Sequence, residues 1–185
     1  MTAQRIETYS FTANDRLLLD TNIWLFLYCP HCVPNTYSAY SAAFKNILSA
    51  KSKIYVSSTI LGEFIYRYCR LAHNLLVAKD AAPKRFKYFR KSPPFRKVAK
   101  AVADAARRVL QAATPVDEGF ASLDIEGILT DFESGRHDFN DLLIAEVCGR
   151  EKLILVTHDE DFSVRDLPIL TANALLINMR FPAGS

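Results

Sequence analysis

The chain has 185 residues and a mass of 20.9 kDa, with 50% hydrophobic and 23% charged residues. This composition excludes a disordered chain, a collagen-like repeat and a small disulfide scaffold. No apolar run approaches the roughly 18 residues of a transmembrane helix, and the first residues lack the basic-then-apolar layout of a signal peptide. We therefore expect a single cytoplasmic domain over residues 1–185, without membrane association.

The net charge is only +3, but it is unevenly distributed along the chain. Residues 79–108 contain eleven Lys and Arg and two Asp, a net charge of +9, so the remainder of the chain carries −6. Such a division predicts a basic arm that binds a polyanion, although a merely solvated helix is the simpler interpretation.

Short apolar runs that end in polar residues alternate with helical patterns along the chain. The expected strands cover residues 16–20, 53–57, 153–157 and 167–170. The expected helices cover residues 23–29, 37–50, 60–78, 95–113, 123–132, 138–149 and 172–179. We expect Thr21 or Asn22 to cap the first helix. This alternation is typical of parallel βαβ units, and it predicts a three-layer α/β/α domain with a central parallel sheet.

The segment from residue 79 to 113 is expected to be a basic helical insertion in that domain. Prolines at 83, 93 and 94 prevent one continuous helix from crossing it. Its aromatic residues alternate with Lys and Arg, an arrangement that suits stacking and phosphate contacts on single-stranded nucleic acid. The same rings could instead anchor the arm to the rest of the protein.

The four cysteines do not suggest a disulfide framework in a chain of this length. Cys29 and Cys32 form a CxxC pair that follows a helix, whereas a thioredoxin-like pair precedes one. We favour a structural or incidental role for this pair over a metal or redox site.

Acidic residues are found where the expected strands end and the neighbouring helices begin. Asp20 follows the first strand, Asp159 follows the third, Glu63 lies early in a helix, and Asp141 opens another. Ligands of open parallel sheets bind beside the carboxyl ends of the strands, so these acids should share one edge. Clustered carboxylates need a cation, and Mg²⁺ prefers such oxygen ligands. This pattern predicts metal-assisted phosphodiester hydrolysis.

Each acid also has an ordinary structural interpretation. Asp20 could simply cap a helix, and Glu63 could serve only the dipole at the start of its helix. Asp138 and Asp141 are spaced i, i+3, so one can cap the helix while the other binds metal, and we favour Asp141 as the ligand. Asp161 lies in an expected turn and is the weakest candidate.

Four segments of the sequence resemble the motifs of the PIN domain family, in the order in which that family has them. They are LLLDTNIWL, SSTILGEFIYR, DFNDLLIAEVC and LILVTHDEDF, spread over residues 17–170. More narrowly, they resemble the toxin ribonucleases of VapBC toxin–antitoxin pairs. The resemblance implies a Rossmann-like fold and cleavage of RNA with Mg²⁺ or Mn²⁺.

On this resemblance, the catalytic and metal-binding acids are Asp20, Glu63, Asp141 and Asp159. The supporting residues are Asn22 beside the first acid and Thr157 in the T-x-D turn, whereas Asp138 and Asp161 are supporting candidates without a fixed position in the pattern. We expect Lys84, Arg85, Lys87, Arg90 and Lys91 to bind the RNA backbone. An antitoxin protein is implied as a partner, and we also expect a homodimer.

Other function classes fit the sequence less well. A HAD-type phosphatase needs an acid two residues after the first Asp, where this chain has Asn22. A receiver domain also clusters acids but has no reason to carry a strongly basic arm. The main alternative is a catalytically inactive PIN-fold module that binds nucleic acid or protein, although the presence of all four acids argues against it.

Overall fold

The computed structural model describes residues 3–29, 38–135, 137–164 and 167–178. The strands are β1 (Gln4–Arg5), β2 (Arg16–Leu19), β3 (Lys53–Val56), β4 (Thr114–Pro115), β5 (Ile154–Val156) and β6 (Ile169–Thr171). They form one sheet in the order β1-β6-β5-β2-β3-β4, and every neighbouring pair is parallel.

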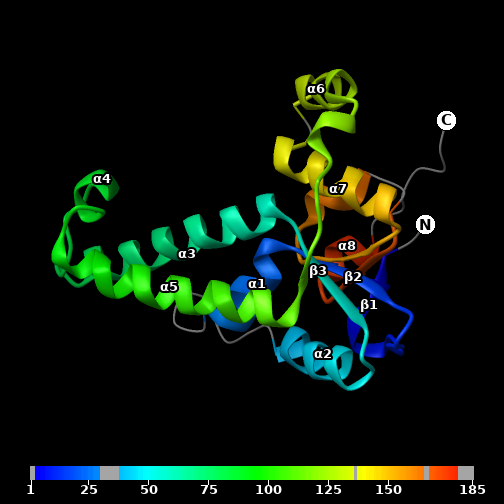
Figure 1. Cartoon of the computed structure of the whole chain (residues 1–185), viewed down its shortest axis with the longest axis horizontal. Coiled ribbons are helices and arrows are strands. Elements are labelled where there is room, and N and C mark those ends of the chain that lie inside the picture. The colour runs from blue at the N-terminus through cyan, green and yellow to red at the C-terminus, as the bar shows by residue number, and fades with distance from the viewer. Residues whose placement is uncertain (1–2, 30–37, 136, 165–166, 179–185) are drawn as a thin grey trace.

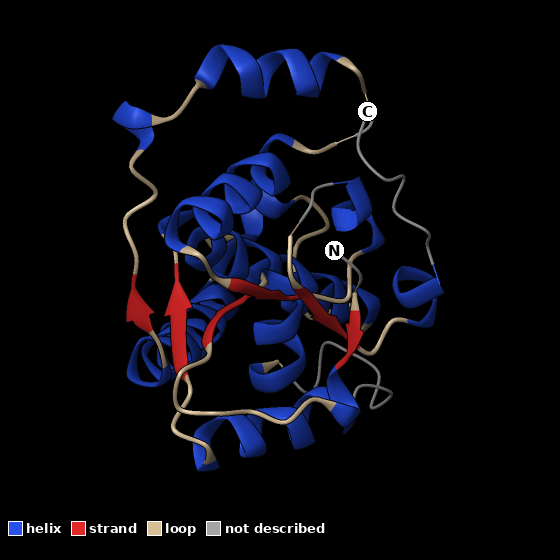
Figure 2. Ribbon diagram, turned by 90° about the vertical axis from the view of Figure 1, so that its right-hand side faces the viewer, coloured by secondary structure: helices blue, strands red, loops and turns tan. Residues whose placement is uncertain are grey.

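Helices cover both faces of this sheet (Figure 2). They are α1 (Thr21–Tyr28), α2 (Ser38–Ser49), α3 (Ser58–Ala78), α4 (Phe86–Phe89), α5 (Pro93–Ala112), α6 (Ile125–Glu133), α7 (Phe139–Glu151) and α8 (Ala174–Asn178). Short 3₁₀ helices occur at Ile6–Thr8, Phe120–Ser122 and Glu160–Val164. The predicted α/β fold with a central parallel sheet is confirmed.

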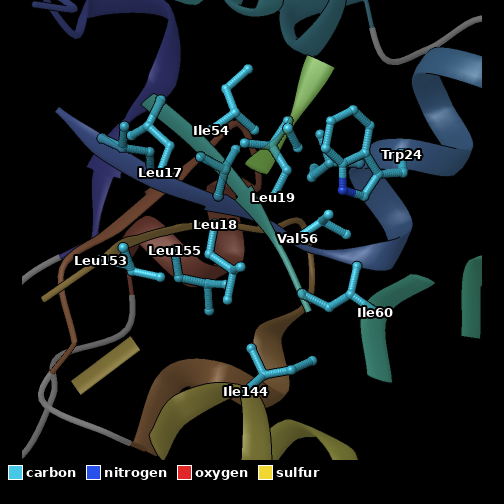
Figure 3. Close-up of a cluster of buried hydrophobic side chains, with 14 of the residues drawn as sticks. Leu17, Leu18, Leu19, Trp24, Ile54, Val56, Ile60, Ile144, Leu153 and Leu155 are labelled. Atoms are coloured by element: carbon cyan, nitrogen blue, oxygen red, sulfur yellow. The ribbon is translucent and has the colours of Figure 1, made fainter. Parts of the chain in front are cut away.

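The core of the sheet is built on β2, the strand that lies between β3 and β5. Successive side chains of a strand point to opposite faces, and Leu17, Leu18 and Leu19 are all buried, so β2 contributes to both hydrophobic layers. Figure 3 shows Leu19 on the side of Trp24 from α1 and Leu18 on the side of Ile144 from α7. This packing fixes the position of the residue that follows β2, which is Asp20.

Two short edge strands were missed in the sequence. β1 pairs with β6 at one edge and β4 pairs with β3 at the other. Pro115 lies in β4, and an edge strand tolerates proline because one of its sides needs no hydrogen-bond donors.

Several element boundaries also differ from the prediction. The fourth expected strand, 167–170, is β6 at Ile169–Thr171, and the last helix begins at Ala174 rather than 172. The cap of α1 is neither Thr21 nor Asn22 but Asp20, as the structural interpretation of that acid expected, because its carboxylate accepts the Thr21 N–H at the start of the helix. The predicted start of α2 at residue 37 lies outside the described residues, as does the predicted end of the last helix at 179.

The basic segment forms an arm together with α3. Helices α3 and α5 contact each other along their length and extend away from the sheet, with α4 at their far end (Figure 1). Phe89 is fully buried and stacks on His73 of α3, with ring centroids 4.7 Å apart, and it also contacts the edge of Phe95. These rings therefore hold the tip of the arm to α3, whereas Tyr88 remains exposed.

Of the residues in the CxxC pair, Cys29 is buried at the end of α1, but Cys32 lies outside the described residues, so its role stays a prediction. Cys69 and Cys148 are buried and are not disulfide-bonded. Across the described part of the chain, no helix combines the length and the hydrophobicity that crossing a membrane would require.

Candidate active site

A pocket of about 210 Å³ lies at the carboxyl ends of the central strands. Four elements contribute acids to it: the ends of β2 and β5, helix α3 and the first turn of α7. It is lined by Asp20, Glu63, Arg67, Asp138, Asn140, Asp141, Asp159 and Asp161. The structure thus brings together all six acids that the sequence singled out.

Asp20 is the most deeply buried of these acids, with 5% of its surface exposed. Its carboxylate accepts hydrogen bonds from the Thr21 N–H at 2.6 Å, from Asn22 Nδ2 at 2.6 Å and from Thr157 Oγ1 at 2.7 Å. Burial nevertheless raises the pKa of Asp20 to about 6, because the hydrogen bonds offset only part of the lost hydration and the charges of Glu63 and Asp159 add to the effect.

The turn after β5 is organised around Thr157. Besides its bond to Asp20, Thr157 Oγ1 accepts the Asp159 N–H at 3.0 Å, and Asp159 Oδ1 accepts the Asp161 N–H at 3.1 Å. Asn22 connects the same turn to α1, because its Oδ1 accepts the His158 N–H at 3.3 Å. A single hydroxyl therefore sets the positions of two of the four candidate catalytic acids.

Glu63 enters the pocket from the second turn of α3. Its Oε2 accepts a hydrogen bond from Thr21 Oγ1 at 3.1 Å, and its Oε1 lies 3.2 Å from a guanidinium nitrogen of Arg67. Arg67 was not singled out in the sequence, although its i, i+4 spacing from Glu63 predicts an ion pair on one helix face. Among the described residues that line the pocket, Arg67 is the one cation.

The two acids at the start of α7 have different roles. Asp138 is the N-cap and accepts the Asn140 N–H at 2.9 Å, while Asp141 lies in the first turn and is half-buried. Burial, together with the negative charges of Asp20, Asp159, Asp138 and Glu63, raises the pKa of Asp141 to about 8. The expectation that one of this pair caps the helix is confirmed for Asp138.

Tyr40 of α2 is a support that the sequence analysis missed. It is buried, and its hydroxyl lies 2.8 Å from His158 Nδ1 and 3.2 Å from the Thr157 carbonyl oxygen, to which it donates. The hydroxyl oxygen of Tyr40 accepts the Ala172 N–H at 2.9 Å. Tyr40 therefore joins the turn after β5 to the end of β6. Nothing in the pattern around residue 40 distinguishes it from an ordinary core aromatic.

Comparison with known proteins identifies the family. The family model of the PIN domain matches residues 17–167, which contain all of the pocket acids. The chain belongs to the PIN domain family. PIN domains are usually Mg²⁺-dependent nucleases, and the family generally uses divalent metals.

A solved structure supports the same fold for this PIN domain. The complex of VapBC2 from Rickettsia felis bound to a DNA fragment from their promoter contains a chain that superposes with a TM-score of 0.55 and 19% sequence identity. The match covers 84% of this chain and 98% of the other. A search of curated proteins found no match.

The donor set of this PIN domain fits a hard divalent cation. The pocket presents the carboxylate oxygens of six acids and only one cation, Arg67, among the described residues that line it, so acidic side chains are in excess there. Within the described residues, no three Asp, Glu, His or Cys side chains are arranged closely enough to enclose one ion. An open arrangement suits Mg²⁺, which keeps several water ligands and binds through one or two carboxylates.

The five basic residues singled out on the arm are all exposed. Lys84 and Arg85 precede α4, Lys87 lies within it, and Arg90 and Lys91 follow it. Phe86, Lys87, Arg90 and Lys91 line an open pocket of about 450 Å³ at the tip. The structure therefore groups these cations at the end of the arm and not beside the acids.

Proposed function

We propose that this chain is a divalent-metal-dependent endoribonuclease that hydrolyses phosphodiester bonds in RNA. Asp20, Glu63, Asp141 and Asp159 would be its catalytic and metal-binding residues, with Mg²⁺ or Mn²⁺ as the cofactor. The observation that carries this proposal is the convergence of these four carboxylates, from four separate elements, on one pocket. Membership of the PIN family and the raised pKa values of Asp20 and Asp141 support it.

In this mechanism, Asp20, Glu63, Asp141 and Asp159 would hold the cation, in part through its water ligands. A bound Mg²⁺ or Mn²⁺ supplies activation of water and neutralisation of charge on the phosphate. Thr157 and Asn22 orient Asp20 through their hydrogen bonds, so the carboxylate is held in place before substrate arrives. Asp138 keeps the first turn of α7, and thus Asp141, in position.

Substrate affinity must come from outside the acidic pocket, because the pocket itself repels phosphates. We propose that Lys84, Arg85, Lys87, Arg90 and Lys91 bind the RNA backbone. Glu63 lies near the start of α3, and the tip of the arm follows the end of α3 at Ala78. At 1.5 Å per residue, Glu63 and Ala78 are about 22 Å apart along the axis of this helix. An RNA that reaches both must span several nucleotides, so we expect poor cleavage of very short substrates.

We further propose that the chain is the toxin of a toxin–antitoxin pair, with an antitoxin protein and a second copy of itself as partners. The resemblance of its motifs to VapC-type toxins supports this, as does the similarity of its fold to a chain of the VapBC2 structure. We also propose that residues 1–185 form one cytoplasmic domain from which the segment 79–113 extends as an arm.

A nuclease assay on the purified full-length chain tests this function. End-labelled single-stranded and hairpin RNAs would be incubated with Mg²⁺ or Mn²⁺ and, in parallel, with EDTA. We expect internal cleavage with metal and none with EDTA. Binding of RNA without cleavage of any substrate under any metal condition would favour the inactive binding module instead.

A further inference from the structure

A second pocket adjoins the acidic one and has a different chemical character. It has a volume of about 330 Å³, within the range of small-molecule sites, and is open to solvent. It is lined by Asn22, Phe26, His158, Asp159, Glu160 and Asn173. Asp159 lines both pockets, so a nucleotide whose phosphate lies over the acids has this second pocket as its neighbour.

The walls of this second pocket are fixed by hydrogen bonds. The ring of His158 is held by a contact of 2.8 Å between its Nδ1 and the Tyr40 hydroxyl. The backbone of His158 is held on both sides, because its N–H donates to Asn22 Oδ1 and its carbonyl oxygen accepts a hydrogen bond of 2.9 Å from Asn173 Nδ2. The ring of Phe26 packs against that of His158 with centroids 5.8 Å apart and planes at 82°. Two aromatic rings, packed edge to face, therefore form a preorganised aromatic corner in an otherwise polar pocket.

We propose that this pocket receives the nucleobase next to the scissile phosphate and that Glu160 selects guanine there. This inference rests on the proposed nuclease function for the identity of its ligand. Phe26 and His158 would supply the surface on which the base stacks, as aromatic side chains do in single-stranded nucleic-acid sites. Among the residues that line this pocket, Glu160 and the shared Asp159 are the two with a carboxylate side chain.

The selection follows from hydrogen-bond chemistry. An ionised carboxylate only accepts hydrogen bonds, and it can accept two parallel ones. The Watson–Crick edge of guanine presents two adjacent donors, N1–H and the N2 amino group. Adenine and cytosine place an acceptor nitrogen beside their amino donor, and uracil has one N–H between two carbonyl oxygens. Among the four bases, only guanine can therefore donate one hydrogen bond to each carboxylate oxygen of Glu160.

Nucleotide binding tests the pocket without requiring catalysis. Dissociation constants for the four nucleoside 5′-monophosphates would be measured with Mg²⁺ by titration calorimetry or NMR. All four carry the same phosphate, so differences in affinity report on the base alone. The variants are Glu160→Gln and Phe26→Leu, with Glu7→Gln and Phe120→Leu as controls at exposed residues that line neither pocket.

We expect wild type to prefer the guanine nucleotide by about tenfold, Glu160→Gln to lose that preference, and Phe26→Leu to weaken all four nucleotides. Glu160 is exposed, so its variant should fold even where Phe26→Leu does not. Sequencing of the ends of cleaved RNA should show the same guanine bias. Equal affinity for all four bases, or a preference unchanged in Glu160→Gln, would overturn the assignment. Guanine binding by a protein that cleaves no RNA would instead refute the nuclease function, while the assignment of the pocket as a guanine site would still hold.

Discussion

Thr157 donates a hydrogen bond of 2.7 Å to the carboxylate of Asp20, although the two residues are 137 positions apart in the chain. The bond forms because β2 and β5 are neighbours in the sheet, so the residues that follow them meet at one edge. It connects the two halves of the candidate active site and makes Asp20 the centre of the pocket.

Thr157→Val keeps the side-chain shape but removes this hydroxyl. Loss of a buried bond to a charged group should lower the free energy of unfolding by about 1–3 kcal/mol above pH 7, where Asp20 is ionised. Urea denaturation of the wild type and the variant measures this change in the free energy of unfolding. Thr157→Ser retains the donor and should remain near wild type. A valine variant as stable as the serine variant would show that the bond contributes nothing.

Metal binding should stabilise the folded chain by mass action, since the unfolded chain lacks the site. We expect Mn²⁺ to raise the melting temperature of wild type relative to EDTA and to have little effect on Asp20→Asn. A metal ion present at a hundred times its Kd raises the free energy of unfolding by about 2.7 kcal/mol. Differential scanning fluorimetry would detect this. Identical, metal-independent melting of both proteins would argue against the site.

Without metal, stability should fall as pH rises. The pKa values of Asp20 and Asp141 are raised from 3.8 to about 6 and about 8, so the folded state holds more protons than the unfolded state between those limits. The free energy of unfolding therefore decreases from about pH 4 to pH 8. Melting temperatures in EDTA should show a flatter decline for Asp141→Asn, whereas Asp131→Asn, at an exposed position on α6, should follow wild type. Equal slopes for all three proteins would contradict the raised pKa of Asp141 in the folded state.

The arm should account for much of the salt dependence of RNA binding. Each phosphate neutralised on a single strand contributes a slope of about −0.7 to log affinity against log salt. Changing Lys84, Arg85 and Lys87 to Gln should therefore flatten the slope by about two units, measured in EDTA to prevent cleavage.

A triple variant at the exposed Lys45, Lys51 and Lys53, which lie outside the arm, is the matched control for that experiment. It should keep the wild-type slope. An unaltered slope in the arm variant would mean that the arm docks a protein or is simply solvated.

The sheet and its acids were predictable because they depend on local patterns. A buried Leu run followed by Asp20 marks a strand and the residue at its carboxyl end, and parallel sheets gather such ends at one edge. β1 and β4 were not predictable, since two-residue strands have no periodicity and exist only through pairing with distant partners.

The supports of the site depend on tertiary structure in the same way. Tyr40 reaches the turn after β5 across 118 residues, and no local pattern signals that contact. Arg67 is a different case from Tyr40, because the sequence shows its i, i+4 spacing from Glu63. Its position in the pocket, however, could not be predicted from that spacing.

The most direct test of the account is RNA cleavage by carboxylate variants in Mn²⁺. The variants are Asp20→Asn and Asp141→Asn, compared with wild type and with Asp131→Asn as the control. Removing one carboxylate from the pocket disrupts charge stabilisation at the phosphate and not the packing of the core, so circular dichroism should remain unchanged. We predict that both pocket variants lose about 100-fold or more of the cleavage rate and that the control retains it. Undiminished turnover by a carefully purified Asp20→Asn protein would contradict the assignment of this pocket as the active site.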